Sequence, residues 1–291
     1  MIFEWSKEKM HSIAASCRTL EVSETGFHKW KRALSKQKLW QVLLVIIHEI
    51  LDEFAENSNY GIERVQLALE QRGIKKSYST VKRAMVKGNL LHESRRSPDG
   101  LTKADKKTHR PENIIKQDFT AEQPCQKWLS DISQVPCKDG TLYVSPMQDC
   151  YNGEIISLAM SDNMKRDLCI ETVKEAYRNT GAGNGVIIHT DSGSQYTSGD
   201  YKEEIGLHRA IQSMSNVGKC YDNARMESWF ATLKKEKLYQ INTMELTMEE
   251  VKTIIWRYVN YYNRYRVTTV NPGGWPPVVY RLKTAQGLKT A

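Results

Sequence analysis

Three acidic residues lie where secondary-structure elements are expected to begin or end, and together they have the chemistry of a divalent-metal site. Asp191 directly follows the apolar run 186–188, Asp131 lies within an earlier apolar-rich run, and Glu227 lies near the start of an expected helix. Carboxylate oxygens are the ligands that Mg²⁺ and Mn²⁺ prefer. Two such ions held by clustered acids can activate a nucleophilic oxygen and stabilise the leaving oxygen of a phosphodiester.

Each acid also has an ordinary structural explanation. Asp, Ser and Gly commonly close strands, so the segment HTDSGSQYTS (189–198) also fits a plain turn. A single Asp or Glu is most often a surface or capping residue. Spacing alone therefore does not identify the site, and the residues around each acid must carry the case.

The second half of the chain has the pattern of an α/β domain. Turn residues separate three apolar-rich runs, which predicts an antiparallel meander, and helices and strands alternate after it. We expect strands at 127–136, 142–150, 154–160, 186–191 and 210–214, and helices at 166–179, 198–205, 222–238 and 246–262. These elements predict a mixed sheet flanked by helices. If the first and fourth strands are neighbours, Asp131 and Asp191 meet in the middle of the sheet.

The first 90 or so residues are almost wholly helical in pattern. Two pairs of helices, at 8–32 and 61–88, have the form of helix-turn-helix units. The last helix would present Lys82, Arg83 and Lys87 outward, suited to phosphate and base-edge contacts. Packed helix pairs are also a common scaffold, so geometry alone leaves DNA binding open.

Charge distribution favours nucleic acid as a partner. The net charge is +8, and all of the excess lies in residues 1–110, which hold 21 Lys and Arg against 13 Asp and Glu. Residues 64–110 alone hold 13 bases and 4 acids. Such asymmetry is typical of a part that meets a polyanion, although a merely soluble basic surface remains the alternative.

The sequence predicts a cytoplasmic protein with no membrane partner. The longest aliphatic run, 42–47, is too short to span a bilayer, and the N-terminus has no apolar stretch suited to secretion. Six cysteines show neither Cys-x-x-Cys nor zinc-ligand spacing, so we expect reduced thiols.

Several stretches resemble a known family. KWLSDIS (127–133), GVIIHTDSGSQYTSGDY (185–201), SMSNVGKCYDNARMESWFATLKKE (213–236) and YYNRYR (261–266) resemble the integrase-type catalytic core of bacterial transposases of insertion-sequence family three, second reading frame. SCRTLEVSETGFHKW and YGIERVQLALEQRGIKKSYSTVKRAM resemble the paired helical modules that precede that core. The resemblance covers about residues 10–282.

The resemblance implies the site and its chemistry. The family's acidic triad falls on Asp131, Asp191 and Glu227, with 35 residues between the last two, and its basic residue falls on Lys234. On one helix, Glu227 and Lys234 would share a face about 10 Å apart. Without the motif, Lys234 would be interpreted as a solvated lysine. The implied fold is ribonuclease-H-like with five strands, and the implied cofactor is two Mg²⁺ or Mn²⁺ ions that serve DNA cleavage and strand transfer.

Other residues of these motifs are candidate DNA contacts, each with an alternative. Gln195 and Tyr196 lie in the loop expected to receive DNA, and Asn223 lies at the start of the glutamate helix. His189 suits either a DNA or supporting contact or packing at the strand end. Arg266 and its tyrosine neighbours could grip DNA, although an aromatic helix face more often packs inward.

These patterns suggest a division into a helical DNA-binding region (1–91), a basic linker (92–122), an integrase-like core with C-terminal helices (123–282) and a tail (283–291). The segment 267–277 departs from the family's pattern. Family members act as a fusion with an upstream reading frame, so the expected partners are terminal-repeat and target DNA, that upstream product, and further copies of the chain on DNA. A non-catalytic DNA-binding regulator and a general nuclease remain alternatives.

Overall fold

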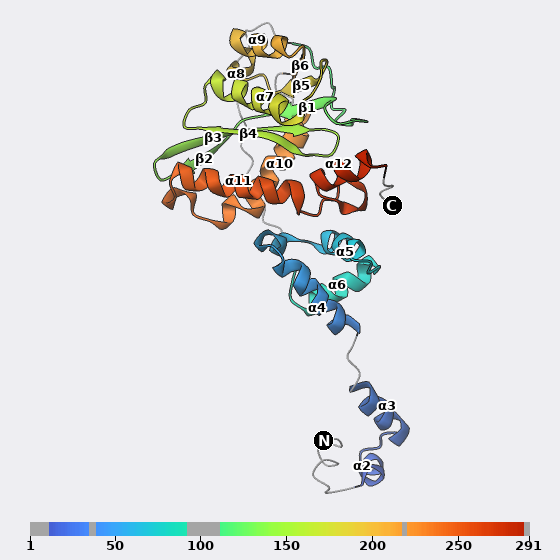
Figure 1. Cartoon of the computed structure of the whole chain (residues 1–291). Helices are drawn as coiled ribbons and strands as arrows, with labels where there is room; N and C mark the ends of the chain where they lie inside the picture. The colour runs from blue at the N-terminus through green and yellow to red at the C-terminus, as the bar shows by residue number, and fades with distance from the viewer. Residues whose placement is uncertain (1–11, 35–38, 92–110, 217–219, 288–291) are drawn as a thin grey trace.

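The computed structural model describes residues 12–34, 39–91, 111–216 and 220–287. It shows a helix pair, then a helical module, then a sheet-containing core that carries the C-terminal helices (Figure 1). The helix pair is α2 (Ile13–Thr19) and α3 (Glu24–Leu34). Much of the expected basic linker, residues 92–110, lies outside the described residues.

Residues 39–91 form what we call the helical module. Its helices are α4 (Leu39–Asp52), α5 (Ile62–Gln71) and α6 (Tyr78–Lys87), with a short 3-10 helix, η1 (Ala55–Asn59), after α4. Apolar residues at helical spacing give each helix one buried face. These faces meet in a core that includes Leu43, Ile47, Val65, Leu69, Val81 and Met85. The predicted helices at 61–71 and up to Lys87 are therefore present.

One mixed sheet organises the core. Its strands are β1 (Lys127–Ser130), β2 (Ser133–Cys137), β3 (Gly140–Asp149), β4 (Ile155–Ser161), β5 (Ile187–Thr190) and β6 (Ile211–Met214). The meander strands pair antiparallel, whereas β1 pairs with β5, and β5 with β6, in parallel. The predicted neighbourhood of the first and fourth strands is confirmed.

The first predicted strand is interrupted. Both β1 and β2 pair with β3 in one unbroken register, as the pairs Ser130 with Met147 and Ser133 with Val144 show. That register places Pro146 opposite Asp131. Proline has no N–H to donate to the neighbouring strand, and the Pro146 carbonyl accepts a hydrogen bond from Ser130 Oγ at 2.9 Å. The ladder therefore opens at Asp131. Because β1 and β2 lie in line, the sheet keeps the predicted five-stranded, ribonuclease-H-like order.

Helices cover both faces of this sheet (Figure 1). Helix α7 (Arg166–Thr180) and helix α9 (Gly199–Leu207) pack on the face that carries Trp128 and Ile188. Helix α10 (Ala224–Glu236) and helix α11 (Met248–Arg264) pack on the face that carries Leu129. Alternation along β1 thus sends neighbouring side chains into two cores.

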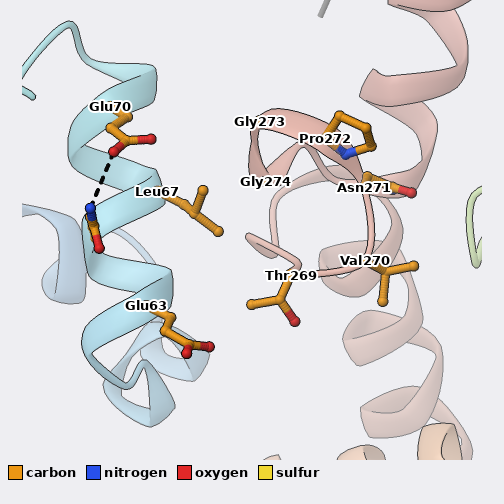
Figure 2. Close-up of a pocket in the computed structure, with 10 residues that line it drawn as sticks. Glu63, Leu67, Glu70, Thr269, Val270, Asn271, Pro272, Gly273 and Gly274 are labelled. Carbon is orange, nitrogen blue, oxygen red and sulfur yellow. Dashed lines mark hydrogen bonds between the residues drawn. The ribbon is translucent and has the colours of Figure 1, made fainter. Parts of the chain in front are cut away.

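The helical module packs against the segment that follows α11. Gln71 Nε2 donates to the Gly273 carbonyl at 2.9 Å, and the Val267 N–H donates to Tyr60 Oη at 2.8 Å. Gly274 has φ +72°, and a Cβ there would lie 2.9 Å from the Leu67 Cβ, so only glycine fits. Figure 2 shows the groove beside this contact, between α5 and residues 269–274. The segment that departs from the family's pattern is thus a docking surface for the module.

Two remaining expectations concern cysteines and membranes. Cys17, Cys125, Cys137, Cys150 and Cys169 are free thiols. Among the described parts of the chain, no helix has the length and apolarity needed to cross a bilayer.

Truncating a buried side chain of β1 tests the packing of the core. Leu129 is fully buried, so Leu129→Ala should lower the free energy of unfolding by about 2–5 kcal/mol. Urea denaturation measures the change. The matched control is Leu207→Ala at a position that is 72% exposed, which should stay within about 0.5 kcal/mol of the parent. Equal effects of the two substitutions would contradict the assigned core.

Candidate active site

The sheet places two of the three predicted acids at one edge. In the parallel pairing, Leu129 lies opposite His189, so Asp131 and Asp191 follow their strands at matching positions. Neighbouring strands are about 4.8 Å apart, which puts the two aspartates side by side. Both side chains are partly buried. The carboxyl ends of the paired strands therefore hold two carboxylates in one small volume.

The surroundings of Asp131 disfavour its negative charge. Burial, then the charge of Asp191, raise the pKa of Asp131 to about 7, and the charge of Glu227 adds to this. The Ile132 N–H, which donates to Asp131 Oδ1 at 2.8 Å, and the Lys234 ammonium act in the opposite direction. Glu227 and Lys234 therefore act on the same carboxylate as Asp191, and all four predicted residues influence one site.

The other two acids also have raised pKa values. Burial raises the pKa of Asp191, and the Gly193 N–H, 3.0 Å from Asp191 Oδ1, opposes it. A Cβ on Gly193 would lie 3.1 Å from that same oxygen, so a larger residue there would crowd the Asp191 carboxylate. Desolvation raises the pKa of Glu227, although its side chain is exposed. Three acids with little compensating positive charge form an environment that suits a cation.

Helix α10 is fixed where it presents Glu227. Asn223 Nδ2 donates to the Ser130 carbonyl at 3.2 Å, directly before Asp131. Arg225 Nη1 donates to the carbonyls of Phe119 and Cys150, each at 2.8 Å. The buried side chains of Met226, Trp229, Phe230 and Leu233 pack this helix on the sheet. Phe230 and Leu233 thus point into the core.

Asp222 and Arg225 are site-shaping residues that sequence reasoning did not identify as such. Asp222 is 1% exposed and accepts hydrogen bonds from Gln117 Nε2 at 2.9 Å and the Asn216 N–H at 3.0 Å. It therefore links Gln117 and Asn216 to the residue that precedes Asn223, the N-cap of α10. The sequence signal that could have identified them is the presence of two opposite charges, Asp222 and Arg225, close to Asn223 in YDNARMESW.

Three of the side chains predicted to contact DNA are buried and interact with other residues of the protein. His189 is fully buried, with Nδ1 2.8 Å from Ser213 Oγ and Nε2 3.1 Å from Ser215 Oγ, and burial lowers its pKa to about 4. Tyr196 is 1% exposed, and its hydroxyl lies 3.3 Å from Ser130 Oγ. Arg266 is buried against Glu236. These three side chains support the strands and helices in this conformation.

Apart from Asn223, which is 5% exposed and bonded to the Ser130 carbonyl, the remaining candidates are more accessible. Lys82, Arg83 and Lys87 are exposed along α6, and the Lys87 ammonium lies 4.9 Å from the centre of the Trp40 ring. Gln195 is partly exposed on the short helix α8 (Ser194–Thr197), where its Nε2 donates to the Met164 carbonyl at 3.1 Å. The basic face of α6 is thus the most open of the predicted DNA contacts.

In this structure, the three acids do not form a complete coordination site for a metal ion. Among the residues that the structure describes, no three His, Cys, Asp or Glu side chains lie close enough together to coordinate a metal ion as they stand. The two aspartates are positioned by paired strands, whereas Glu227 is exposed on the first turn of a helix.

The sheet order and its acidic edge define an integrase-type core of ribonuclease-H-like fold. Residues 121–220 match a family model described as an integrase core domain, and residues 227–284 match a second model with the same description. The HTLV-2 integrase catalytic core domain in complex with magnesium (trimeric form) is 16% identical with a TM-score of 0.44, covering 55% of this chain and 98% of that one.

Full-length relatives identify the family. The transposase InsF for insertion sequence IS3A of Escherichia coli strain K12 is 30% identical over 88% of this chain and 89% of its own length. The putative transposase InsK for IS150 of the same strain is 29% identical over 92% of each chain. The chain belongs to the IS3 family of insertion-sequence transposases, which are polynucleotidyl transferases.

Removing one of the repelling charges tests the electrostatics of the site. Asp131→Asn keeps an oxygen that can accept from Ile132, so the metal-free protein at about pH 8 should gain on the order of 1 kcal/mol in unfolding free energy. The rise in melting temperature on adding Mn²⁺ should shrink. Denaturation in EDTA and in Mn²⁺ measures both.

The control for this test is Glu203→Gln, which neutralises an exposed carboxylate on α9. It should change neither the unfolding free energy nor the response to Mn²⁺. A clear loss of stability in metal-free Asp131→Asn would contradict the inferred repulsion.

Proposed function

We propose that this transposase is of the type that uses two aspartates and a glutamate, Asp131, Asp191 and Glu227, to hold two Mg²⁺ or Mn²⁺ ions and to cut and rejoin DNA at the ends of an insertion sequence. The observation that carries the proposal is the parallel pairing of β1 with β5, which sets the two aspartates side by side. The effect of the Glu227 charge on Asp131 supports the third member.

The donor set fits the cofactor. Three carboxylates supply hard oxygen ligands. Their pKa values are raised, mainly by burial, so their negative charge is poorly solvated and a bound cation would stabilise it. Bound divalent ions would supply activation of the attacking oxygen and stabilisation of the leaving oxygen. Asp131 and Asp191 follow paired strands, and the exposed Glu227 side chain acts on Asp131 from α10. Lys234 would meet a DNA phosphate beside the acids.

The proposed reaction has two in-line displacements at phosphorus. In the first, water attacks the phosphodiester at the element's end, the P–O3′ bond breaks, and a 3′-hydroxyl and a 5′-phosphate result. In the second, that 3′-hydroxyl attacks a phosphodiester of the target, a new P–O bond forms, and the target's own 3′-oxygen leaves with a proton. No covalent protein intermediate is needed, so the protein contributes positioning and charge neutralisation.

DNA binding is assigned to the helical region. Residues 1–91 would bind the terminal repeats, with Lys82, Arg83 and Lys87 on α6 toward phosphates and base edges. Residues 92–122 would link this region to the core at 123–282, and residues 283–291 would form a tail. The proposed partners are terminal-repeat and target DNA, an upstream reading-frame product and further copies of the chain, assembled on the bacterial nucleoid in the cytoplasm.

Cleavage of a labelled terminal-repeat duplex in Mn²⁺ tests the acidic triad. Asp191→Asn and Glu227→Gln should each lower the cleavage rate by at least about 100-fold, because each removes a negative ligand from the site. Glu203→Gln should cut at the parent rate, and all variants should bind the duplex as the parent does.

Three results would overturn the assignment. Parent-like cleavage by Asp191→Asn would exclude that residue from catalysis. Cutting of DNA without terminal repeats at the same rate would favour a general nuclease, and binding without any cutting by the parent chain would favour a regulator.

The salt dependence of DNA binding tests the α6 surface. If Lys82 and Arg83 each meet a phosphate, the double variant Lys82→Ala/Arg83→Ala should reduce the slope of log affinity against log salt by about 2. Fluorescence anisotropy across a salt series measures the slope. Lys202→Ala, at an exposed position on α9, should leave it unchanged, and a slope unaffected by the double variant would move the DNA contact elsewhere.

A further inference from the structure

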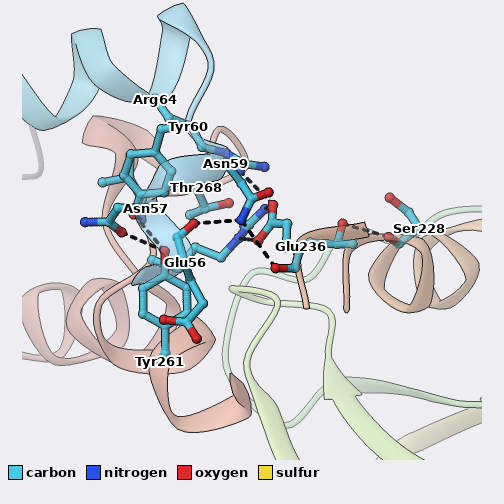
Figure 3. Close-up of polar contacts among 12 residues, drawn as sticks. Glu56, Asn57, Asn59, Tyr60, Arg64, Ser228, Glu236, Tyr261 and Thr268 are labelled. Atoms are coloured by element: carbon cyan, nitrogen blue, oxygen red, sulfur yellow. Dashed lines mark hydrogen bonds and ion pairs between the residues drawn. The ribbon is translucent and has the colours of Figure 1, made fainter. Parts of the chain in front are cut away.

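The last residue of α10, Glu236, is buried between the core and the helical module. Its side chain is 7% exposed, although α10 begins beside the active site. Figure 3 shows residues of the module gathered around it. A buried carboxylate requires partners, because an unpaired charge away from water is costly.

Four donors satisfy this one carboxylate. From the core, Arg266 donates through Nε at 2.8 Å and Nη2 at 2.7 Å, and the Tyr258 hydroxyl donates at 2.9 Å. From α5 of the module, Arg64 Nη1 donates at 2.7 Å. Burial alone would raise the pKa of Glu236, but the hydrogen bonds and charges of the two arginines outweigh it and hold the pKa below its usual range. The carboxylate is therefore ionised at neutral pH.

Further polar contacts join the helical module to the core around Glu236. Lys237 Nζ bonds Glu56 Oε1 at 2.8 Å, and Gln240 Nε2 donates to Asn59 Oδ1 at 2.8 Å. Asn59 Nδ2 donates to the Glu236 carbonyl at 3.3 Å. The module thus holds both the side chain and the backbone at the end of α10.

The contact around Glu236 is better suited to fixing the orientation of the helical module than to adding stability. A buried ion pair adds little net stability compared with apolar packing of the same volume. Hydrogen bonds, however, fix distance and angle, because they weaken steeply when bent or lengthened. Together with the contact of Gly274 with Leu67 further along α5, the Glu236 contact ties α5 to the core at two points.

The same helix carries a catalytic acid. Glu227 and Glu236 are nine residues apart on α10, which is about 13 Å along the axis. The N-terminal end of α10 is tied to the strand before Asp131 by Asn223. One rigid helix therefore connects the acidic site with the module that carries α6.

We propose that the contact between Arg64 and Glu236, which we call the latch, fixes the distance from α6 to the acidic triad and so determines which phosphodiester of the element's end is cut. Arg64 and Glu236 act as positioning residues, because neither touches the reacting atoms. The inference rests on the proposed function of the triad and of α6.

The test is Arg64→Met in the full chain. This substitution keeps the side-chain length and leaves Arg266 on Glu236, so the core keeps its buried pair. The matched control is Arg72→Met, because Arg72 lies at the end of α5 and pairs with Glu53 at 2.6 Å inside the module. Cleavage of end-labelled terminal-repeat DNA in Mn²⁺ is mapped at nucleotide resolution, with duplex affinity and melting temperature measured alongside.

We expect Arg64→Met to bind the duplex like the parent, to spread its cuts over neighbouring phosphodiesters, and to cut the parent's main position about 10- to 100-fold more slowly. Arg72→Met should cut where the parent does. A merely structural role would lower the melting temperature without moving the cut, so an unchanged cut position in folded Arg64→Met overturns the proposal.

Two further outcomes distinguish a failure of the proposed function from a failure of the latch. If the parent chain does not cut, the proposed function fails before the latch is tested. If Arg64→Met has no melting transition, Lys237→Met decides the question, since Lys237 is partly exposed and crosses the same interface. Cuts spread by Lys237→Met support the latch, and cuts confined to the parent position overturn it.

Discussion

Three negative charges confined at one edge of a sheet repel one another, and the fold has to hold them together. The parallel hydrogen bonds between β1 and β5 fix Asp131 and Asp191 side by side, and α10 brings Glu227 to the same carboxylate. Burial, together with this repulsion, raises the pKa of Asp131 to about 7. Strained or repelling groups persist where the surrounding structure over-determines them and function uses them. Sheet, helix anchors and helical module can all be understood as supports for this cluster.

Much of the site could be predicted from the sequence because its signals are local. An apolar run that ends in Asp191, a strand that contains Asp131 and a helix that carries Glu227 are each visible in short stretches. The sheet order followed from the alternation of elements. The break between β1 and β2 was missed, because it depends on Pro146 of another strand. The sequence of one strand does not show which residue of the neighbouring strand will lie opposite each of its positions.

The long-range contacts escaped sequence reasoning for the same reason. Arg266 was a candidate DNA contact, but the structure uses its guanidinium to neutralise Glu236. A signal existed, because Glu236 continues the stripe of Met226, Trp229 and Leu233 along α10, and a charge on an apolar stripe indicates a buried pair. The segment 267–277 packs against the α5 surface of this chain. Its partner lies some 200 residues earlier, as the bond from Gln71 to Gly273 shows.

Anomalous diffraction from crystals of the protein soaked in Mn²⁺ would locate the bound ions. We expect manganese peaks within about 2.0–2.6 Å of oxygens from both Asp131 and Asp191, with the Glu227 side chain turned toward them. Peaks at other residues would contradict this expectation. A Glu227 carboxylate that remains more than about 10 Å from the two aspartates with metal bound would do the same.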